Sequence, residues 1–130
     1  MVEQLKSNIY QKVIDAGYHI SDRPNLEEKY PWLIFRLSNL QKTKFLKVRY
    51  TSVNFTFDIF SLYNGEKEIL SIENELTNIV EKIAEENSEI MGVALKNFKI
   101  LDDKSQGPIM KHGILVYQFI LSTEETLDEE

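Results

Sequence analysis

The chain of 130 residues contains no cysteine, only two histidines and only three prolines. Without cysteine it can form neither a disulfide nor a thiolate metal site, which excludes redox chemistry through thiols and fits a reducing cytosol. No apolar run approaches the roughly 18 residues that a membrane-spanning helix needs. The first residues mix charged and apolar side chains, so we expect no secretory signal peptide and a soluble protein.

The sequence also lacks the short motifs that are typical of catalytic, metal-binding and nucleotide-binding sites. His19 and His112 are far apart and belong to no metal-ligand pattern, so we interpret both as ordinary loop or strand-end residues. Asp102 and Asp103 lack the glycine and the further oxygen ligands of a calcium loop. The five glycines form no phosphate-binding loop, and no Gly-x-Ser-x-Gly elbow occurs. We therefore predict no enzyme activity, no catalytic residue, no cofactor and no metal.

Charge is distributed unevenly along the chain, whose formal net charge is -6. Five acidic residues lie between 124 and 130, and the rest of the chain carries a net charge of only -1. Residues 66–89 include eight glutamates and two lysines, whereas residues 31–57 include five cations and no acid. These cations are Arg36, Lys42, Lys44, Lys47 and Arg49. The chain therefore has one basic and one acidic segment.

Hydrophobic spacing predicts two helices. Apolar residues three and four apart predict the first helix over residues 2–16, and Gly17 offers its end. A longer stripe predicts the second helix over residues 66–86, with glutamates and lysines on its other side. The first stripe is Val2, Leu5, Ile9, Val13 and Ala16, and the second is Ile69, Ile72, Leu76, Ile79, Val80 and Ile83.

Short segments rich in β-branched and aromatic residues predict the strands. Residues 32–37 form the first, and residues 38–44 are expected to be a polar connection. Residues 45–50 and 53–62 predict one long strand, or two strands interrupted by a bulge near Thr51. Residues 93–101 and 113–122 predict a hairpin through the polar loop Asp102–Pro108, and Ser21–Asn25 predicts a loop.

The order of these elements is α-β-β-α-β-β. Strands in adjacent pairs with short connections favour an α+β fold, with a mainly antiparallel sheet and two helices packed on one face. We expect one domain over residues 1–123 and a disordered acidic tail over residues 124–130.

The predicted strands carry more large apolar side chains than one covered face can bury. Residues 113–122 alternate two apolar sets, one beginning at Ile114 and the other at Leu115, and Trp32 opposes Leu33 in the same way. Strands of this kind are expected to be buried on both faces. We therefore expect a partner surface to cover the face that the helices leave free.

The separated charges predict contact between copies, in which the basic segment of one meets the acidic helix of the next. Nucleic acid is the alternative partner for the basic segment, but the acidic net charge and the absence of a recognition motif disfavour it. The candidate interface residues are Arg36, Lys47 and Arg49 on one side and Glu73, Glu81 and Glu85 on the other.

The order and texture of the segments resemble the tail-terminator proteins of long-tailed bacteriophages, also called tail-completion, minor tail or head-tail joining proteins. The resemblance rests on the opening amphipathic helix, the strand Tyr30–Leu37, the aromatic strand Asn54–Ser61, the long helix from Glu66 and the hairpin that ends with Val116–Ser122. It covers nearly the whole chain. It consists of pattern and order, and it carries over no functional residue.

The resemblance implies a structural virion component that forms a ring, commonly of six copies, at the head-proximal end of the tail tube. There it would stop tube growth and join the tail to the head, with the tail-tube protein and a head-completion protein as partners. Assembly would take place in the host cytoplasm, without a cofactor, a membrane or specific nucleic-acid recognition.

Two alternatives belong to other classes. One is a protein-binding module outside phages, such as an immunity or adaptor protein, whose acidic helix contacts a basic partner. The other is a small enzyme with a site between the sheet and the helices, which a deep polar pocket would indicate.

Overall fold

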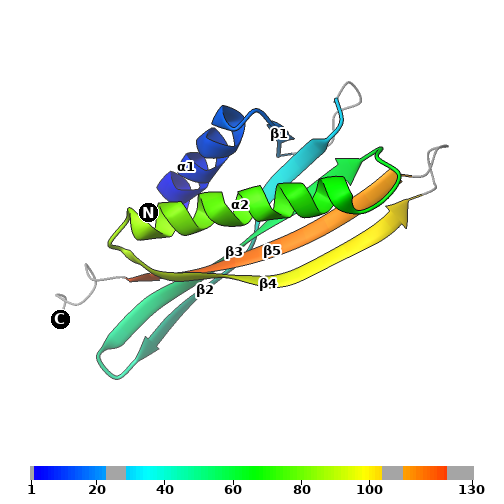
Figure 1. Ribbon diagram of the computed structural model, residues 1–130. Helices are drawn as coiled ribbons and strands as arrows, with labels where there is room; N and C mark the ends of the chain where they lie inside the picture. The colour runs from blue at the N-terminus through cyan, green and yellow to red at the C-terminus, as the bar shows by residue number, and fades with distance from the viewer. Residues whose placement is uncertain (1, 23–28, 104–109, 123–130) are drawn as a thin grey trace.

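The computed structural model describes residues 2–22, 29–103 and 110–122, which form two helices and one five-stranded sheet (Figure 1). The elements in chain order are α1 (Val2–Asp15), β1 (His19–Ser21), β2 (Trp32–Phe45), β3 (Val48–Ser61), α2 (Lys67–Glu85), β4 (Ile90–Asp103) and β5 (Met110–Ser122). The strand order is β1-β2-β3-β5-β4, and every pairing is antiparallel except that of β1 with β2. The predicted α+β fold, with both helices on one face of the sheet, is confirmed.

Both helices lie where the hydrophobic spacing predicts them. Leu5, Ile9 and Val13 of α1 are buried, as is the predicted stripe of α2 apart from the half-buried Ile79. This stripe packs with the buried row of the sheet, in which Phe55 and Phe57 of β3 lie beside Phe119 and Tyr117 of β5. Full burial of one such side chain contributes about 1.5–3 kcal/mol, so this layer supplies most of the hydrophobic driving force.

The strand boundaries differ from the prediction in the first hairpin. Residues 38–44 are not a connection, because β2 continues through them to Phe45 and pairs with β3 along its whole length. The turn lies instead at Leu46 and Lys47. Of the two alternatives for residues 45–62, one long strand is correct, although it begins only at Val48. The register shift of this hairpin lies in β2, between Leu37 and Asn39. The second half of β2 is exposed on both faces, so its residues are mostly polar and have the composition of a loop. The prediction of a connection was wrong for this reason.

The short strand β1 was not predicted. Three residues are too few for a periodic pattern, and they form a strand only because they pair in parallel with the start of β2. The predicted final hairpin is confirmed by the antiparallel pairing of β4 and β5, which runs to Asp103 and Met110. Most of its loop, most of the predicted loop Ser21–Asn25 and the acidic tail lie outside the described residues.

Gly113 allows α2 to approach the sheet closely. It lies on β5 between Ile59 and Ile100, and a Cβ atom placed on it would lie 2.7 Å from Cγ2 of Ile69 in α2. Contacts this short force neighbouring atoms to move. The residue type at this position therefore sets the spacing between helix and sheet.

Gly113→Ala is expected to lower the free energy of unfolding by about 1–3 kcal/mol, because overpacking displaces the first turns of α2. Urea unfolding followed by circular dichroism measures the loss. Gly92→Ala is the matched control, since a Cβ there meets nothing within 4 Å, and it should change stability by less than about 0.5 kcal/mol. Equal losses in the two variants would contradict this account of the packing.

Candidate functional site

Part of the sheet face opposite the helices is closed by its own side chains. Trp32 and Ile34 are each 8% exposed although no described helix covers them. The Trp32 ring stacks on Phe60 with centroids 5.1 Å apart and its Nε1 donates a hydrogen bond to Ser21 Oγ at 3.3 Å, while Phe60 stacks on His112 at 4.4 Å. The expectation that this whole face needs a partner's cover is therefore too broad.

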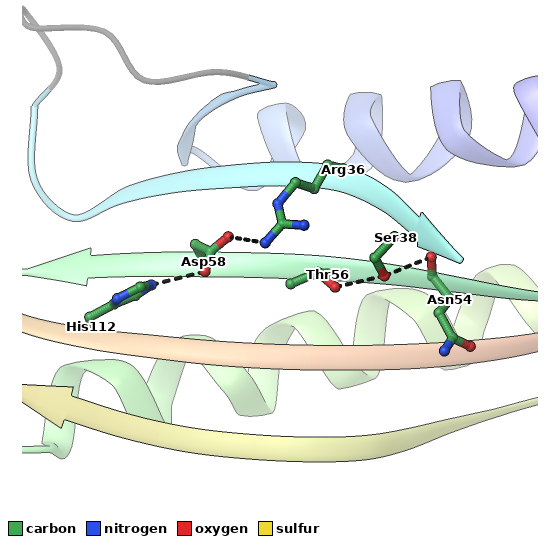
Figure 2. Close-up of polar contacts among 6 residues, drawn as sticks. All are labelled: Arg36, Ser38, Asn54, Thr56, Asp58 and His112. Atoms are coloured by element: carbon green, nitrogen blue, oxygen red, sulfur yellow. Dashed lines mark hydrogen bonds and ion pairs between the residues drawn. The ribbon is translucent and has the colours of Figure 1, made fainter. Parts of the chain in front are cut away.

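A buried carboxylate occupies the middle of the same face (Figure 2). Asp58 in β3 lies between a side chain of β2 and a side chain of β5. Its Oδ1 is 2.9 Å from Nε2 of His112 in β5. Its Oδ2 accepts a hydrogen bond at 3.2 Å from the guanidinium of Arg36 in β2. Burial alone would raise the pKa of Asp58, but the contacts with His112 and Arg36 together hold it below its ordinary value. The carboxylate joins three strands at one point.

A second polar group lies one step further along the face. Thr56 Oγ1 donates a hydrogen bond to Ser38 Oγ at 2.8 Å, and Ser38 Oγ donates in turn to the backbone oxygen of Asn54 at 3.2 Å (Figure 2). Ser38 lies at the register shift of β2, between Leu37 and Asn39. The centre of this face is thus a polar network that holds β2 against β3, and not an apolar surface.

The Asp58–His112 pair was missed by the sequence analysis, which placed His112 at a strand end. The two residues are 54 positions apart, and only the register of β3 with β5 brings them together. A carboxylate and an imidazole could form the base of an acyl-transfer site, but no described hydroxyl forms a hydrogen bond with His112. The contact joins β3 to β5 through side chains.

The described residues offer no other grouping with evident chemistry. They contain no cluster of three or more histidine or carboxylate side chains that could hold a metal ion. An open hollow of about 400 Å³ lies beside the start of α2, lined in part by Tyr18, Tyr63 and Glu68. Two of its polar groups form hydrogen bonds within the protein, since Tyr18 donates to Glu75 and Ser61 donates to Glu68.

The strongest exposed feature is the end of the β2–β3 hairpin, residues 42–50, here called the arm. It extends beyond the rest of the sheet (Figure 1), because β5 pairs with β3 only as far as Tyr50 within the described residues. Phe45, Leu46 and Val48 in the arm are 67%, 80% and 56% exposed. Three large apolar side chains therefore project into solvent on a thin ribbon.

The arm has two chemically different faces. Phe45 and Val48 are directly opposite each other and lie on one face, while Lys44 and Arg49 are directly opposite each other and lie on the other. Lys42 lies on the same cationic face. It pairs with the buried Thr51, which is two residues from Arg49 and therefore on the same side of β3. Like charges directly across a strand pair are destabilising, so the arm is not arranged for its own stability.

The six candidate interface residues do not form two simple patches. Lys47 and Arg49 lie on the arm, whereas Arg36 lies on the face opposite Arg49 and is bound to Asp58. Lys42 and Lys44 lie on the same face as Arg49, and Arg36 does not. The basic segment is therefore split by the alternation of the strand, which a count of charges along the sequence does not reveal.

The three candidate glutamates lie in a row of i, i+4 steps on α2, with Thr77 between the first two. Glu81 and Glu85 are exposed, but Glu73 is half-buried and accepts a hydrogen bond from Thr77 Oγ1 at 2.8 Å. The Tyr117 hydroxyl of β5 lies 2.7 Å from the same Thr77 oxygen. Burial raises the pKa of Tyr117, and the nearby Glu73 and Glu81 carboxylates raise it further. Glu73 and Thr77 therefore lie on the side of α2 that faces β5, and each further step of four residues turns the acidic row by about 40° toward the outer surface of the helix.

No protein-family model matches the chain, and a search among curated proteins finds no significant match. Within the described residues, no helix has both the length and the apolar character needed to cross a membrane.

Asp58→Asn is expected to lower the free energy of unfolding by about 1–3 kcal/mol near neutral pH, because it removes the charge that His112 and Arg36 contact. The native pKa of Asp58 is depressed, so its stabilisation is present above the ordinary value of 3.8 and is lost as the pH falls through the native pKa. The difference between wild type and variant should therefore shrink in acid. Urea unfolding across this pH range measures it.

Arg36→Ala serves as the comparison for Asp58→Asn. The Arg36 side chain is 52% exposed, so its loss should cost less than about 1 kcal/mol. A larger effect from Arg36 than from Asp58, or a difference for Asp58 that does not change in acid, would contradict the assigned network.

Proposed function

We propose that this chain is a structural assembly subunit that forms a ring, and that it acts as a tail terminator of the phage type. The observation that carries the proposal is the arm, with Phe45, Leu46 and Val48 exposed on a ribbon that projects from the body. An exposed apolar patch of this kind marks an interaction site or an aggregation hazard. The cations of the arm, including Lys47 at the turn, favour an interaction site whose partner surface is acidic.

The position of the arm favours contacts that close into a ring. Contact between two arms would bring their cations together, so we infer that the arm contacts a different surface of the second copy, which makes the contact head-to-tail. Such contacts form a ring when the rotation between subunits closes. A ring is the shape that can cap a tube and end its growth, with its other side free to join a head.

The sheet edges disfavour the competing mode of assembly, in which strands of different copies pair directly. The free edges of the sheet are irregular. On one side β1 pairs with only the first three residues of β2, and β2 shifts register beyond them, between Leu37 and Asn39; on the other side β4 shifts register at two places. Lys42 and Lys96 lie along these edges. Bulges and lysines are the features by which natural sheets prevent edge pairing. Assembly through the side chains of the arm avoids this obstacle.

Sedimentation of the purified chain, alone and with a tail-tube protein, tests the proposal. The wild type should form a discrete ring, visible by negative-stain electron microscopy, and Phe45→Ser with Val48→Ser should sediment as a monomer because the apolar face of the arm is lost. Leu62→Ser, at the other end of β3 and 50% exposed in the wild type, is the matched control and should assemble normally.

A wild-type chain that remains monomeric both alone and with a tail-tube protein would contradict the ring proposal. In that event the adaptor alternative gains, because the exposed glutamates of α2 suit a basic partner of another kind. Genes for a tail tube and for head completion beside this gene would support the phage assignment, and a neighbouring toxin gene would oppose it.

Leu46 provides a second test, because its backbone conformation is unfavourable for any residue other than glycine. Its φ angle is 55°, in the left-handed region, which costs a non-glycine residue about 1 kcal/mol. Leu46→Gly should leave the free energy of unfolding within about 1 kcal/mol of the wild type, or above it, since the strain is relieved. The same substitution should weaken self-association in sedimentation, because it removes an 80% exposed side chain. Unchanged association would count against a role for the tip.

A further inference from the structure

The border between α2 and β4 combines an apolar strip with a row of acids. β4 is the edge strand, and four of its core-side residues are only partly buried because α2 covers them incompletely. The acidic row of α2 begins on the side toward β5 and β4, as the hydrogen bond of Thr77 with Tyr117 and the pairing of Tyr117 with Leu95 show. Each step of four residues then turns the row by about 40° toward the outer surface of the helix. The border consists of Val93, Leu95, Phe98 and Ile100 of β4 and Glu73, Glu81 and Glu85 of α2.

The border is complementary to the arm: both have an apolar surface, and their charges are opposite. The arm has an apolar face at Phe45 and Val48 and a cationic face at Lys44 and Arg49, and the border has an apolar floor beside an acidic wall. A helix is about 10–12 Å wide with its side chains, so the flank of α2 rises above the plane of the sheet. A ribbon with its apolar face on β4 would hold its long cationic side chains level with that flank.

The dimensions of the two surfaces also agree. The cations from Lys42 to Lys47 span about 13 Å of the arm, four steps of roughly 3.3 Å, because the chain reverses at Leu46 and Lys47. Glu73 to Glu85 span about 18 Å of helix at 1.5 Å per residue. The cations of the arm can therefore lie beside the part of the acidic row from Glu73 to Glu81, which is about 12 Å long. Opposite charges in register set the orientation and the choice of partner more than the affinity.

The arm cannot use the border of its own molecule, because β2 and β3 run on past the end of β5 and direct the arm away from α2 (Figure 1). We propose that the arm of each copy docks on the α2–β4 border of the next copy, with Phe45 and Val48 on the strip of β4 and the cations against the acidic row. This inference rests on the proposed function and names its subunit contact. It replaces Arg36 with Lys42 and Lys44 among the interface residues.

Reciprocal charge reversal tests the contact in the full chain. Lys44→Glu with Arg49→Glu should weaken self-association at least about tenfold, measured by sedimentation at several concentrations. Adding Glu81→Lys and Glu85→Lys to the same chain should restore association. Lys12→Glu with Lys67→Glu, exposed cations outside the arm, is the control for net charge and should associate like the wild type.

The results separate this inference from the proposed function. A wild type that never associates defeats both, whereas a wild type that associates equally well after the arm reversal defeats only the contact. A folded arm variant that the second reversal does not restore also overturns the contact. Association that nuclease treatment abolishes would show that the cations bind nucleic acid, and it would overturn the contact as well.

Cysteine cross-linking gives an independent measurement, because the natural chain has no cysteine. Leu46→Cys at the tip and Asn74→Cys on the exposed side of α2 should yield disulfide-linked species larger than dimers under mild oxidation. Each single variant can form at most a dimer. Leu46→Cys with Gln4→Cys on α1 is the matched control, and a ladder of similar yield in that control would overturn the proposed docking site.

Discussion

The packing of α2 on the sheet is the interaction on which the other features depend. Its buried stripe seats on the aromatic row of β3 and β5, and Gly113 lets Ile69 come close to the strand beneath it. Once this contact is made, the rotation of the helix about its axis is fixed. That rotation turns Glu73 and Glu81 toward Tyr117 and leaves the apolar residues of β4 only half covered. The border is therefore a consequence of the core.

The face without helices solves a different problem. A sheet covered on one side only must present its other side to water or to a partner, and here its centre is occupied by Asp58, Thr56 and their hydrogen-bond partners. The aromatic rings at one end stack on one another and so bury Trp32 without a second layer. The network spans three strands and fixes their register, which positions the arm at the far end of β2 and β3.

The arm shows a conflict between local stability and the proposed assembly. Folding alone favours glycine at a left-handed turn position, opposite charges across a strand pair and polar side chains in solvent. The arm has instead Leu46 at the turn, Lys44 opposite Arg49, and Phe45 and Val48 exposed. Departures from local preference that gather in one place are expected at functional sites, where the compensating contacts come from a partner.

The sequence by itself determined both helices, the α+β class and the pairing of the last two strands, because long amphipathic periods survive in any tertiary context. It also determined that positive and negative charge are separated along the chain. It could not place the turn at Leu46, since β2 is exposed on both faces there and shows no alternation, and it could not detect β1. Only the tertiary structure brought Asp58 to His112, divided Arg36 from Arg49 and set the acidic row beside β4. Those relations depend on strand register and on which side of each strand a residue lies, and a change of one residue in register reverses that side.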